Sequence, residues 1–358
     1  MGARESLKGE ATGWGRVWKQ ALGYLLAGAF LAWVFHDIHV ERMLTHIGSM
    51  SWWWIPAAVV CDILSYCCEG VRWHYLLLPA GRLPVLRATQ AVYIGLFTNE
   101  VTPLRFGELV RTYLASRWLK RPISAVIPSM LVGRLLDGAW LAVGVGAIAI
   151  LMPLPKDLLV AGDVFGLAVL GLVGAFLFLV LWKRKTVSKW GEPVASGSGV
   201  LFRLRRMAGQ VVQGIVEIGT FRTLAMASVF SLGLLALQAL SFWLVMKSYR
   251  LPLPLVAGAA VFLVVHFGTA IPNAPANVGS YQFFTVVGLG LFGVEKTLAT
   301  GFSIVAFIIL TLPLWVLGLL ALWGSGTTLA GIRADLGRIK MQDQDVGFEH
   351  KPTAGPAG

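Results

Sequence analysis

Residues 97–111 read Phe-Thr-Asn-Glu-Val-Thr-Pro-Leu-Arg-Phe-Gly-Glu-Leu-Val-Arg, so four charges and a proline interrupt an otherwise apolar segment. A second interrupted segment, residues 266–282, reads His-Phe-Gly-Thr-Ala-Ile-Pro-Asn-Ala-Pro-Ala-Asn-Val-Gly-Ser-Tyr-Gln. Each segment has a proline followed four residues later by a glycine, and the two pairs lie 172 residues apart. Matching breaks in two halves of an apolar sequence are typical of duplicated transport proteins, in which the breaks mark the substrate site.

The same shift of 172 residues aligns longer apolar runs. It lays residues 52–75 over 224–247 and residues 126–150 over 298–322. The sequence therefore predicts two repeats.

Composition places the chain in a membrane. Of its 358 residues, 56% are hydrophobic and 13% are charged, and the mean hydropathy is +0.72. Soluble domains are about one quarter charged, so we expect an all-α polytopic membrane protein. The net charge of +12 comes from basic residues between apolar runs, which indicates topology and anionic lipids rather than nucleic acid. The three cysteines share one apolar run without a metal-ligand spacing, and we expect no metal or cofactor.

About 20 apolar residues are needed to cross a bilayer as a helix. Full spans are predicted at residues 19–36, 52–77, 123–151, 158–182, 223–247 and 297–323. Residues 88–110 and 253–293 contain polar and Pro/Gly breaks and are predicted to be re-entrant or broken-helix hairpins. The first span lacks a following cleavage site, so we expect it to be retained.

The distribution of Lys and Arg predicts the orientation. With both hairpins re-entrant, 22 of the 30 basic residues lie in cytoplasmic loops and tails, five lie outside, and Arg72, Arg105 and Arg134 lie in or beside apolar segments. Three spans per repeat then invert the second copy, and the hairpin tips are expected to meet near the midplane. The predicted regions are a cytoplasmic N-terminal tail (1–18), repeat 1 (19–151), repeat 2 (158–325) with a basic cytoplasmic loop (183–222), and a disordered cytoplasmic tail (334–358).

The basic loop leaves two alternatives open. Residues 201–221 can form an amphipathic helix on anionic lipid, or the whole loop can be solvated and serve only as a positive-inside signal.

The first interrupted segment carries the charges from which a binding site can be built. Arginine suits a phosphate because its planar fork binds two oxygens at once. One interpretation is an anionic head-group site made of Arg105, Arg111 and Arg134, with Glu108 and Asp137 holding the guanidinium groups. The alternative is that these i,i+3 charges only join the hairpin to the next span. Glu69 and Arg72 form a further i,i+3 pair, which we interpret as structural.

The second interrupted segment is polar but uncharged. Pro272, Pro275 and Gly279 break the helix and free backbone groups, which Asn273, Asn277 or a substrate can satisfy. A half-helix starting near Asn277 would direct its N–H groups at an anion, although Asn277 can also be a plain helix cap.

At these residues the chain resembles the lysylphosphatidylglycerol synthase transmembrane-domain family, which consists of flippase-like membrane proteins. The motif of the first half matches Asn99, Pro103, Gly107, Glu108, Arg111, Arg134 and Asp137; that of the second matches Pro272, Pro275, Ala276, Gly279 and Gln282. Ala276 stands where the family has glycine, and Gln282 stands where it has an acidic residue. The resemblance covers residues 15–325 and implies a flippase-like transporter without the soluble synthase domain.

Three functions remain open. The first is movement of an anionic or head-group-modified lipid across the bacterial cytoplasmic membrane: a phospholipid, a polyprenyl-phosphate sugar or a hopanoid-pathway lipid. The second is a membrane-embedded head-group transferase, for which Glu108 and Asp137 are poor bases because arginines neutralise them. The third is a non-catalytic partner of a glycosyl or aminoacyl transferase. We expect a transporter rather than an enzyme, with both termini cytoplasmic.

Overall fold

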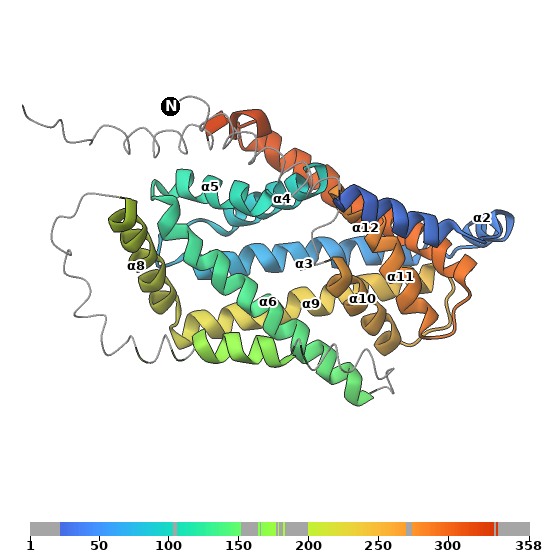
Figure 1. Ribbon diagram of the computed structural model, residues 1–358. Helices are drawn as coiled ribbons and strands as arrows, with labels where there is room; N and C mark the ends of the chain where they lie inside the picture. Colours follow the sequence, from blue (N-terminus) through green and yellow to red (C-terminus); the bar gives the residue numbers. More distant parts are fainter. Residues whose placement is uncertain are drawn as a thin grey trace, which may run out of the picture.

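The computed structural model describes residues 22–102, 106–151, 164, 166–176, 178, 182, 200–269, 274–332 and 334–335. This part of the chain is helical and contains no strand. After the helix Leu22–Phe35, the elements follow in the order α2 (Val40–Gly48), α3 (Trp54–Leu77), α4 (Val85–Val101), α5 (Gly107–Leu119), α6 (Ile123–Leu151), the helix Gly166–Phe176, α8 (Val200–Ile218), α9 (Phe221–Ser248), α10 (Leu255–Thr269), the 3-10 turn η2 (Pro275–Asn277), α11 (Ser280–Gly290) and α12 (Lys296–Gly324) (Figure 1).

Among the described residues, four helices, α3, α6, α9 and α12, are long and apolar enough to cross a membrane. The helix Leu22–Phe35 and α2 count as a fifth span if taken together, but they are bent by 85°. These helices match the predicted spans within a few residues. The exception is 158–182, of which the structure describes the short helix Gly166–Phe176 and three further residues.

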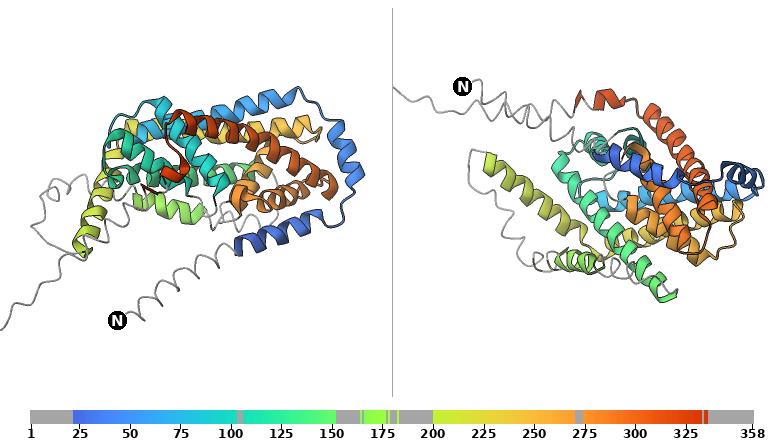
Figure 2. Two further views of the ribbon diagram at one scale, coloured as in Figure 1. Left: turned by 90° about the horizontal axis from the view of Figure 1, so that it is seen from above. Right: turned by 45° about the vertical axis from the view of Figure 1, so that its right-hand side comes forward.

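The centre of the molecule is the antiparallel pair α3 and α9, which lie side by side (Figures 1 and 2). At one end Ser51 N donates to Ser248 O, and near the other the rings of Tyr75 and Phe230 stack with centroids 6.1 Å apart. Between these points Ser241 Oγ donates to Ala58 O at 2.7 Å. The pair is therefore in contact over most of its length.

The first hairpin consists of α4 and α5, which pack against each other. Its open ends lie together, because the Arg87 guanidinium sits 5.2 Å from the centre of the Trp118 ring. Its tip, next to residues 103–105, is closed by Asn99, whose Oδ1 accepts a hydrogen bond from Gly107 N at 2.8 Å. The segment predicted as a hairpin at 88–110 thus doubles back, and it extends further, to Leu119.

The second hairpin consists of α10, η2 and α11, within the predicted range 253–293. Its two helices also pack against each other, and Gly268 lies against the ring of Phe284. The turn η2 contacts α4 of the first hairpin, so the two broken elements meet inside the molecule.

The apolar core is divided between the hairpins. One cluster, which includes Trp73, Ile94 and Leu114, surrounds the first hairpin. Another, which includes Phe242, Leu289 and Phe302, surrounds the second. Each hairpin is therefore held in its own packed environment.

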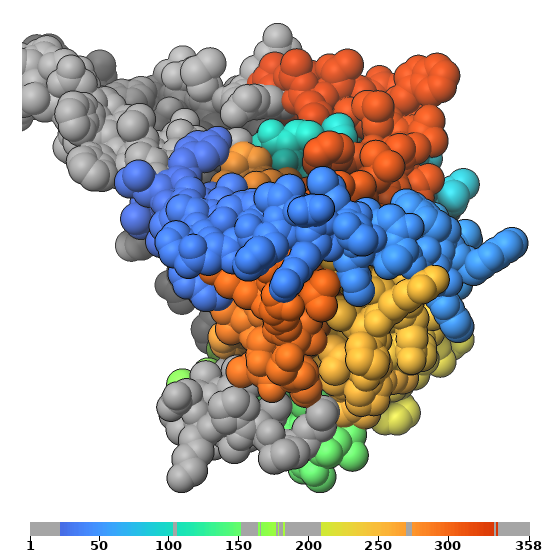
Figure 3. Space-filling view, turned by 90° about the vertical axis from the view of Figure 1, so that its right-hand side faces the viewer, coloured from blue at the N-terminus to red at the C-terminus, as the bar shows by residue number. Residues whose placement is uncertain are grey.

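Each of the two ends of the molecule is covered by one helix. At one end α2 packs on α12, with His39 N near Thr297 Oγ1 and Arg42 near Glu295. Figure 3 looks at this end, where the blue segment that begins the described chain crosses the face. At the other end α8 packs on α6, and Ser124 donates to Gln210.

Two segments between the predicted spans contain helices. Residues 37–51, which connect the predicted spans 19–36 and 52–77 and were not predicted to be helical, contain α2. Of the alternatives for 183–222, residues 200–218 form a helix. The N-terminal tail 1–18, residues 183–199 and residues 336–358 lie outside the described residues.

Candidate functional site

Three helices each contribute two opposite charges spaced three residues apart. Residues at i and i+3 share one face of a helix, so each pair points in one direction. The six residues join in a single sequence of ion pairs, called here the charge network: Arg111, Glu69, Arg72, Asp137, Arg134 and Glu108. Its three arginines and three carboxylates give a net charge of zero.

The buried end of the network is Arg111 on α5. Its Nη1 lies 2.5 Å from Glu69 Oε1 on α3, its Nε lies 3.1 Å from the sulfur of Met130, and its guanidinium covers the ring of Trp73 at 5.1 Å. Arg111 is 5% exposed. Its charge is therefore satisfied inside the protein and faces no solvent.

The centre of the network is Arg72, which is 2% exposed. Its Nη1 donates to Asp137 on α6 and, at 3.1 Å, to Ser231 Oγ on α9. Its Nη2 lies 3.9 Å from Glu69 Oε1. Arg72 thus connects α3 to α6 and to the opposite member of the central helix pair.

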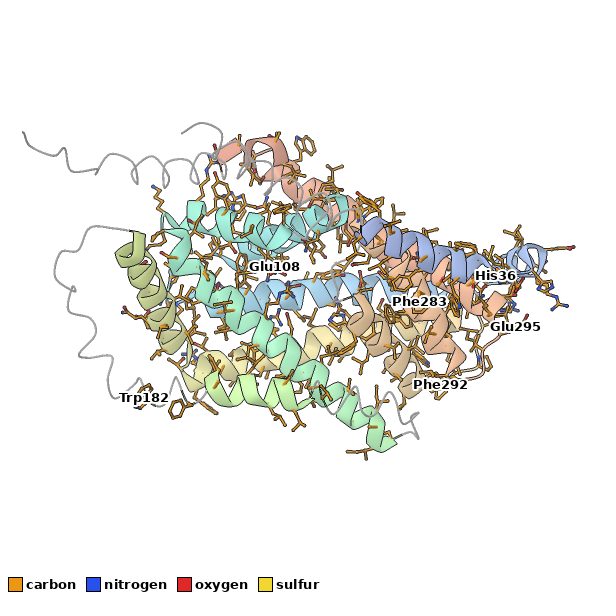
Figure 4. The ribbon with its side chains drawn as sticks, in the orientation of Figure 1. His36, Glu108, Trp182, Phe283, Phe292 and Glu295 are labelled. Carbon is orange, nitrogen blue, oxygen red and sulfur yellow. The ribbon has the colours of Figure 1, made fainter. Side chains whose placement is uncertain are left out.

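The network opens at Arg134 on α6. The side chain of Arg134 is 50% exposed, and that of Glu108 is 39% exposed. Arg134 Nη2 pairs with Glu108, and its Nη1 lies 3.3 Å from Asp137 Oδ2. Figure 4 shows Glu108 between α5 and α6, far from Glu295 at the other end of the molecule.

Close packing of glycines brings Glu108 to this position. A Cβ on Gly95 would lie 2.8 Å from Gly107 O, and one on Gly107 would overlap the backbone of Gly95. Only glycines allow α4 and α5 to approach so closely. Glu108, next to Gly107, is thereby fixed at the start of α5.

The tip of the second hairpin is shaped by backbone conformation. Asn277 adopts a left-handed conformation with φ of 53°, and Gly279 precedes α11 with φ of 89°. Gly279 N donates to Gln282 Oε1 at 2.8 Å, and Gln282 is buried. Gln282, which replaces the acidic residue of the family motif, therefore closes the start of α11. The cap of this helix is Gly279 rather than Asn277.

The structure brings together four of the predicted site residues: Glu108, Arg111, Arg134 and Asp137. The expected i,i+3 ion pair of Arg134 with Asp137 is present. Glu108 and Arg111 instead pair with different helices. Asn99 holds the first hairpin through Gly107. Pro103, Arg105, Pro272 and Asn273 lie outside the described residues, and Pro275 begins η2.

Sequence reasoning left out Glu69 and Arg72, which were interpreted as a local structural pair. They form the middle of the network and bind partners 42 and 65 residues away. The signal was present, because two ionisable residues in an apolar span need partners and are commonly functional.

The described residues include no group of three His, Cys, Asp or Glu side chains placed to hold a metal ion. A separate cavity of about 410 Å³ lies at the α3–α9 end next to α8, lined by His74, Tyr75, Leu78, Arg82, Arg222 and Thr223. This cavity contains no member of the charge network.

Comparison with known families gives one match. Residues 20–318 match the lysylphosphatidylglycerol synthase TM region. The chain belongs to this family. Neither curated proteins nor solved structures give a match.

The lysylphosphatidylglycerol synthase TM region includes both hairpins and all six members of the charge network. The network therefore lies within the matched region. Membership supports a membrane protein related to lipid modification or transport.

Proposed function

We propose that this protein moves an anionic or head-group-modified lipid between the two leaflets of the bacterial cytoplasmic membrane. The observation that carries the proposal is the half-exposed Arg134, bound to two carboxylates in the middle of an apolar helix. Candidate lipids are a phospholipid, a polyprenyl-phosphate sugar or a hopanoid-pathway lipid.

The depth of Arg134 supports this proposal. It is the twelfth residue of α6, about 16 Å from the helix start at a rise of about 1.5 Å per residue. The hydrocarbon core is about 30 Å thick, so Arg134 would lie near its middle. A half-exposed guanidinium at that depth is costly in hydrocarbon, and a polar passage or a lipid head group would satisfy it.

The ion pairs of Arg134 can be exchanged. In a polar passage the pair of Arg134 with Glu108 would be exposed to water, where an ion pair contributes only about 0–1 kcal/mol, so a lipid phosphate could replace Glu108 on Arg134 at small cost. Nη2 of Arg134 would then bind a phosphate oxygen while Nη1 remains paired with Asp137. Arg111 and Arg72 are already paired with carboxylates in the interior and would keep the charge network in place around Arg134.

An inverted repeat would supply the two alternating openings that transport needs. The starts of α4, α5 and α6 precede those of α10, α11 and α12 by 170, 173 and 173 residues. Packing repeats as well: α12 packs on α4 as α6 packs on α10, and α2 packs on α12 as α8 packs on α6. In this proposal the first hairpin enters from the cytoplasm and the second from outside.

Two other functions are compatible with membership of the same family. A head-group transferase needs a free base, and the two carboxylates at the Arg134 end of the charge network, Glu108 and Asp137, are both paired with Arg134. A non-catalytic partner would present lipids to a glycosyl or aminoacyl transferase. Transport fits the half-exposed, mid-helix arginine best.

The test is reconstitution into vesicles containing phospholipids labelled on the head group, with a membrane-impermeant quencher to report the leaflet. We expect the wild type to expose inner-leaflet label and Arg134→Ala to abolish this activity. Arg42→Ala is the matched control, because Arg42 also pairs with a carboxylate but is 71% exposed at the α2 end. Chemical conversion of the lipid would favour the transferase. No movement of any lipid, together with co-purification of a transferase, would favour the partner.

Orientation is tested separately by cysteine labelling in intact cells, in a background lacking the native cysteines. We expect Glu295→Cys to react with an impermeant reagent from outside and Arg222→Cys to react only after permeabilisation. The reverse pattern would contradict cytoplasmic termini.

A further inference from the structure

A second acidic site lies outside the charge network, at Asp62 on α3. Asp62 is 5% exposed, and its Oδ2 has no hydrogen-bond partner among the residues that the structure describes. Asp62 is also in none of the ion pairs found there. Glu69, seven residues later on the same helix, differs from Asp62 because it binds Arg111 and lies near Arg72.

The surroundings of Asp62 are weakly polar. The titratable groups within electrostatic range of its carboxyl are Cys61 and Tyr66 on α3, Tyr93 on α4 and Tyr281 on α11; Glu69 and Glu100 share the neighbourhood of Tyr66. The Tyr281 hydroxyl, like Asp62 Oδ2, has no hydrogen-bond partner among the described residues. Tyr93 is engaged elsewhere, since its hydroxyl donates to Ile63 O.

Among the described residues, an ionised carboxylate here would have no arginine partner, and its Oδ2 no hydrogen-bond donor, to compensate the lost hydration. Burial of an unpaired charge costs several kcal/mol or more, and a carboxyl group avoids that cost by taking up a proton. The neutral acid is therefore the form that fits the described conformation.

The position of Asp62 connects it to the moving parts of a transporter. Tyr281 belongs to the second hairpin and Tyr93 to the first, and η2 of the second hairpin contacts α4. A displacement of the second hairpin would take Tyr281 away from Asp62 and admit water. The carboxyl group would then be able to release its proton.

We propose that Asp62 is a proton-binding site, protonated when the two hairpins are together and able to release its proton when they separate. In the lipid transport proposed above, on which this role depends, Asp62 couples lipid movement to the proton gradient. The proton is taken from water on one side, is held on a carboxyl oxygen, and returns to water on the other side. No other bond is made or broken.

Proton binding is tested on detergent-solubilised protein without any transport assay. The infrared difference spectrum between wild type and Asp62→Asn at pH 7 should contain the carbonyl band of a protonated carboxyl group. Asp37→Asn is the control, because Asp37 is 82% exposed and pairs with His36; its difference spectrum should lack the band. Asn preserves the shape of the neutral acid, so the variant should remain folded and monodisperse. Absence of the band from the Asp62 spectrum would overturn the proposal.

Coupling is tested in vesicles carrying labelled lipid. We expect a pH gradient of one unit to change the wild-type rate by up to about tenfold, and Asp62→Asn to lose this response while Asp37→Asn retains it. A response to a sodium gradient instead, or an unchanged pH response in Asp62→Asn, would overturn the coupling role. If the band is present but the wild type moves no lipid, the proton site is supported and the proposed transport function fails.

Discussion

The guanidinium of Arg111 on the first hairpin lies 2.5 Å from the carboxylate of Glu69 on α3, and both side chains are buried. This ion pair joins the hairpin to the central helix pair. Removing one partner leaves a buried charge without compensation, which is far more costly than losing the pair as a whole.

Glu69→Gln should therefore destabilise the protein by about 3–5 kcal/mol, measured by chemical denaturation in detergent. Glu108→Gln should cost about 0–1 kcal/mol, because its pair with Arg134 is half-exposed. The double variant Glu69→Met with Arg111→Met should recover much of the loss. Equal losses from Glu69→Gln and Glu108→Gln would show that the burial of the network has no energetic consequence.

Gly107→Ala should disrupt the first hairpin, because the added methyl would overlap the backbone of Gly95. We expect a loss of about 3 kcal/mol or more and reduced expression of folded protein. Gly146→Ala on α6 is the control: its Cβ would meet nothing within 4 Å, and alanine favours the helix by about 1 kcal/mol. A stable Gly107→Ala variant would contradict the close packing of α4 on α5.

Gly279→Ala separates two sources of cost at the second hairpin. Its φ of 89° strains alanine, and the new Cβ would lie 2.6 Å from Ala27 O. At Gly293, which has φ of 75° and open space around it, an alanine would meet the backbone strain without any steric contact. Gly293→Ala should cost about 1 kcal/mol, and Gly279→Ala should cost clearly more in the same denaturation experiment. Equal costs would mean that the contact with Ala27 is easily relieved.

Arg134→Lys tests the geometry of the exposed site rather than its charge. Lysine keeps the charge but cannot present Nη1 to Asp137 and Nη2 to Glu108 or to a phosphate at the same time. We expect vesicle lipid movement to fall about tenfold or more, equivalent to about 1.4 kcal/mol, with little change in stability. Arg42→Lys is the control and should leave the rate unchanged. An unchanged rate in Arg134→Lys as well would show that the site does not need Nη1 and Nη2 to bind two partners at the same time.

The sequence alone predicts the parts of the fold that depend on local chemistry. Long apolar runs predicted α3, α6, α9 and α12, and proline and glycine breaks predicted the positions of both hairpins. The short helix α2 was missed because residues 37–51 lack a long apolar run. The i,i+3 spacing of Arg134 and Asp137 predicted a pair that is present.

The partners across helices could not be predicted in the same way. Spacing puts Glu69 and Arg72 on one face of α3, but the rotation of α3 about its axis decides what that face meets. That rotation is set by packing against α9, where Arg72 reaches Ser231 from the other half of the sequence. Burial of Asp62 away from any partner likewise depends on the neighbouring helices rather than on its own segment.

The order of the charge network along the chain has a consequence for biogenesis. All six ionisable residues precede residue 138, whereas Ser231, which bonds Arg72, comes much later. When the ribosome has completed α6, three arginines and three carboxylates have already been made, and α9 has not. All six charges can therefore neutralise one another within the nascent amino-terminal half, before Ser231 and the rest of the later half exist.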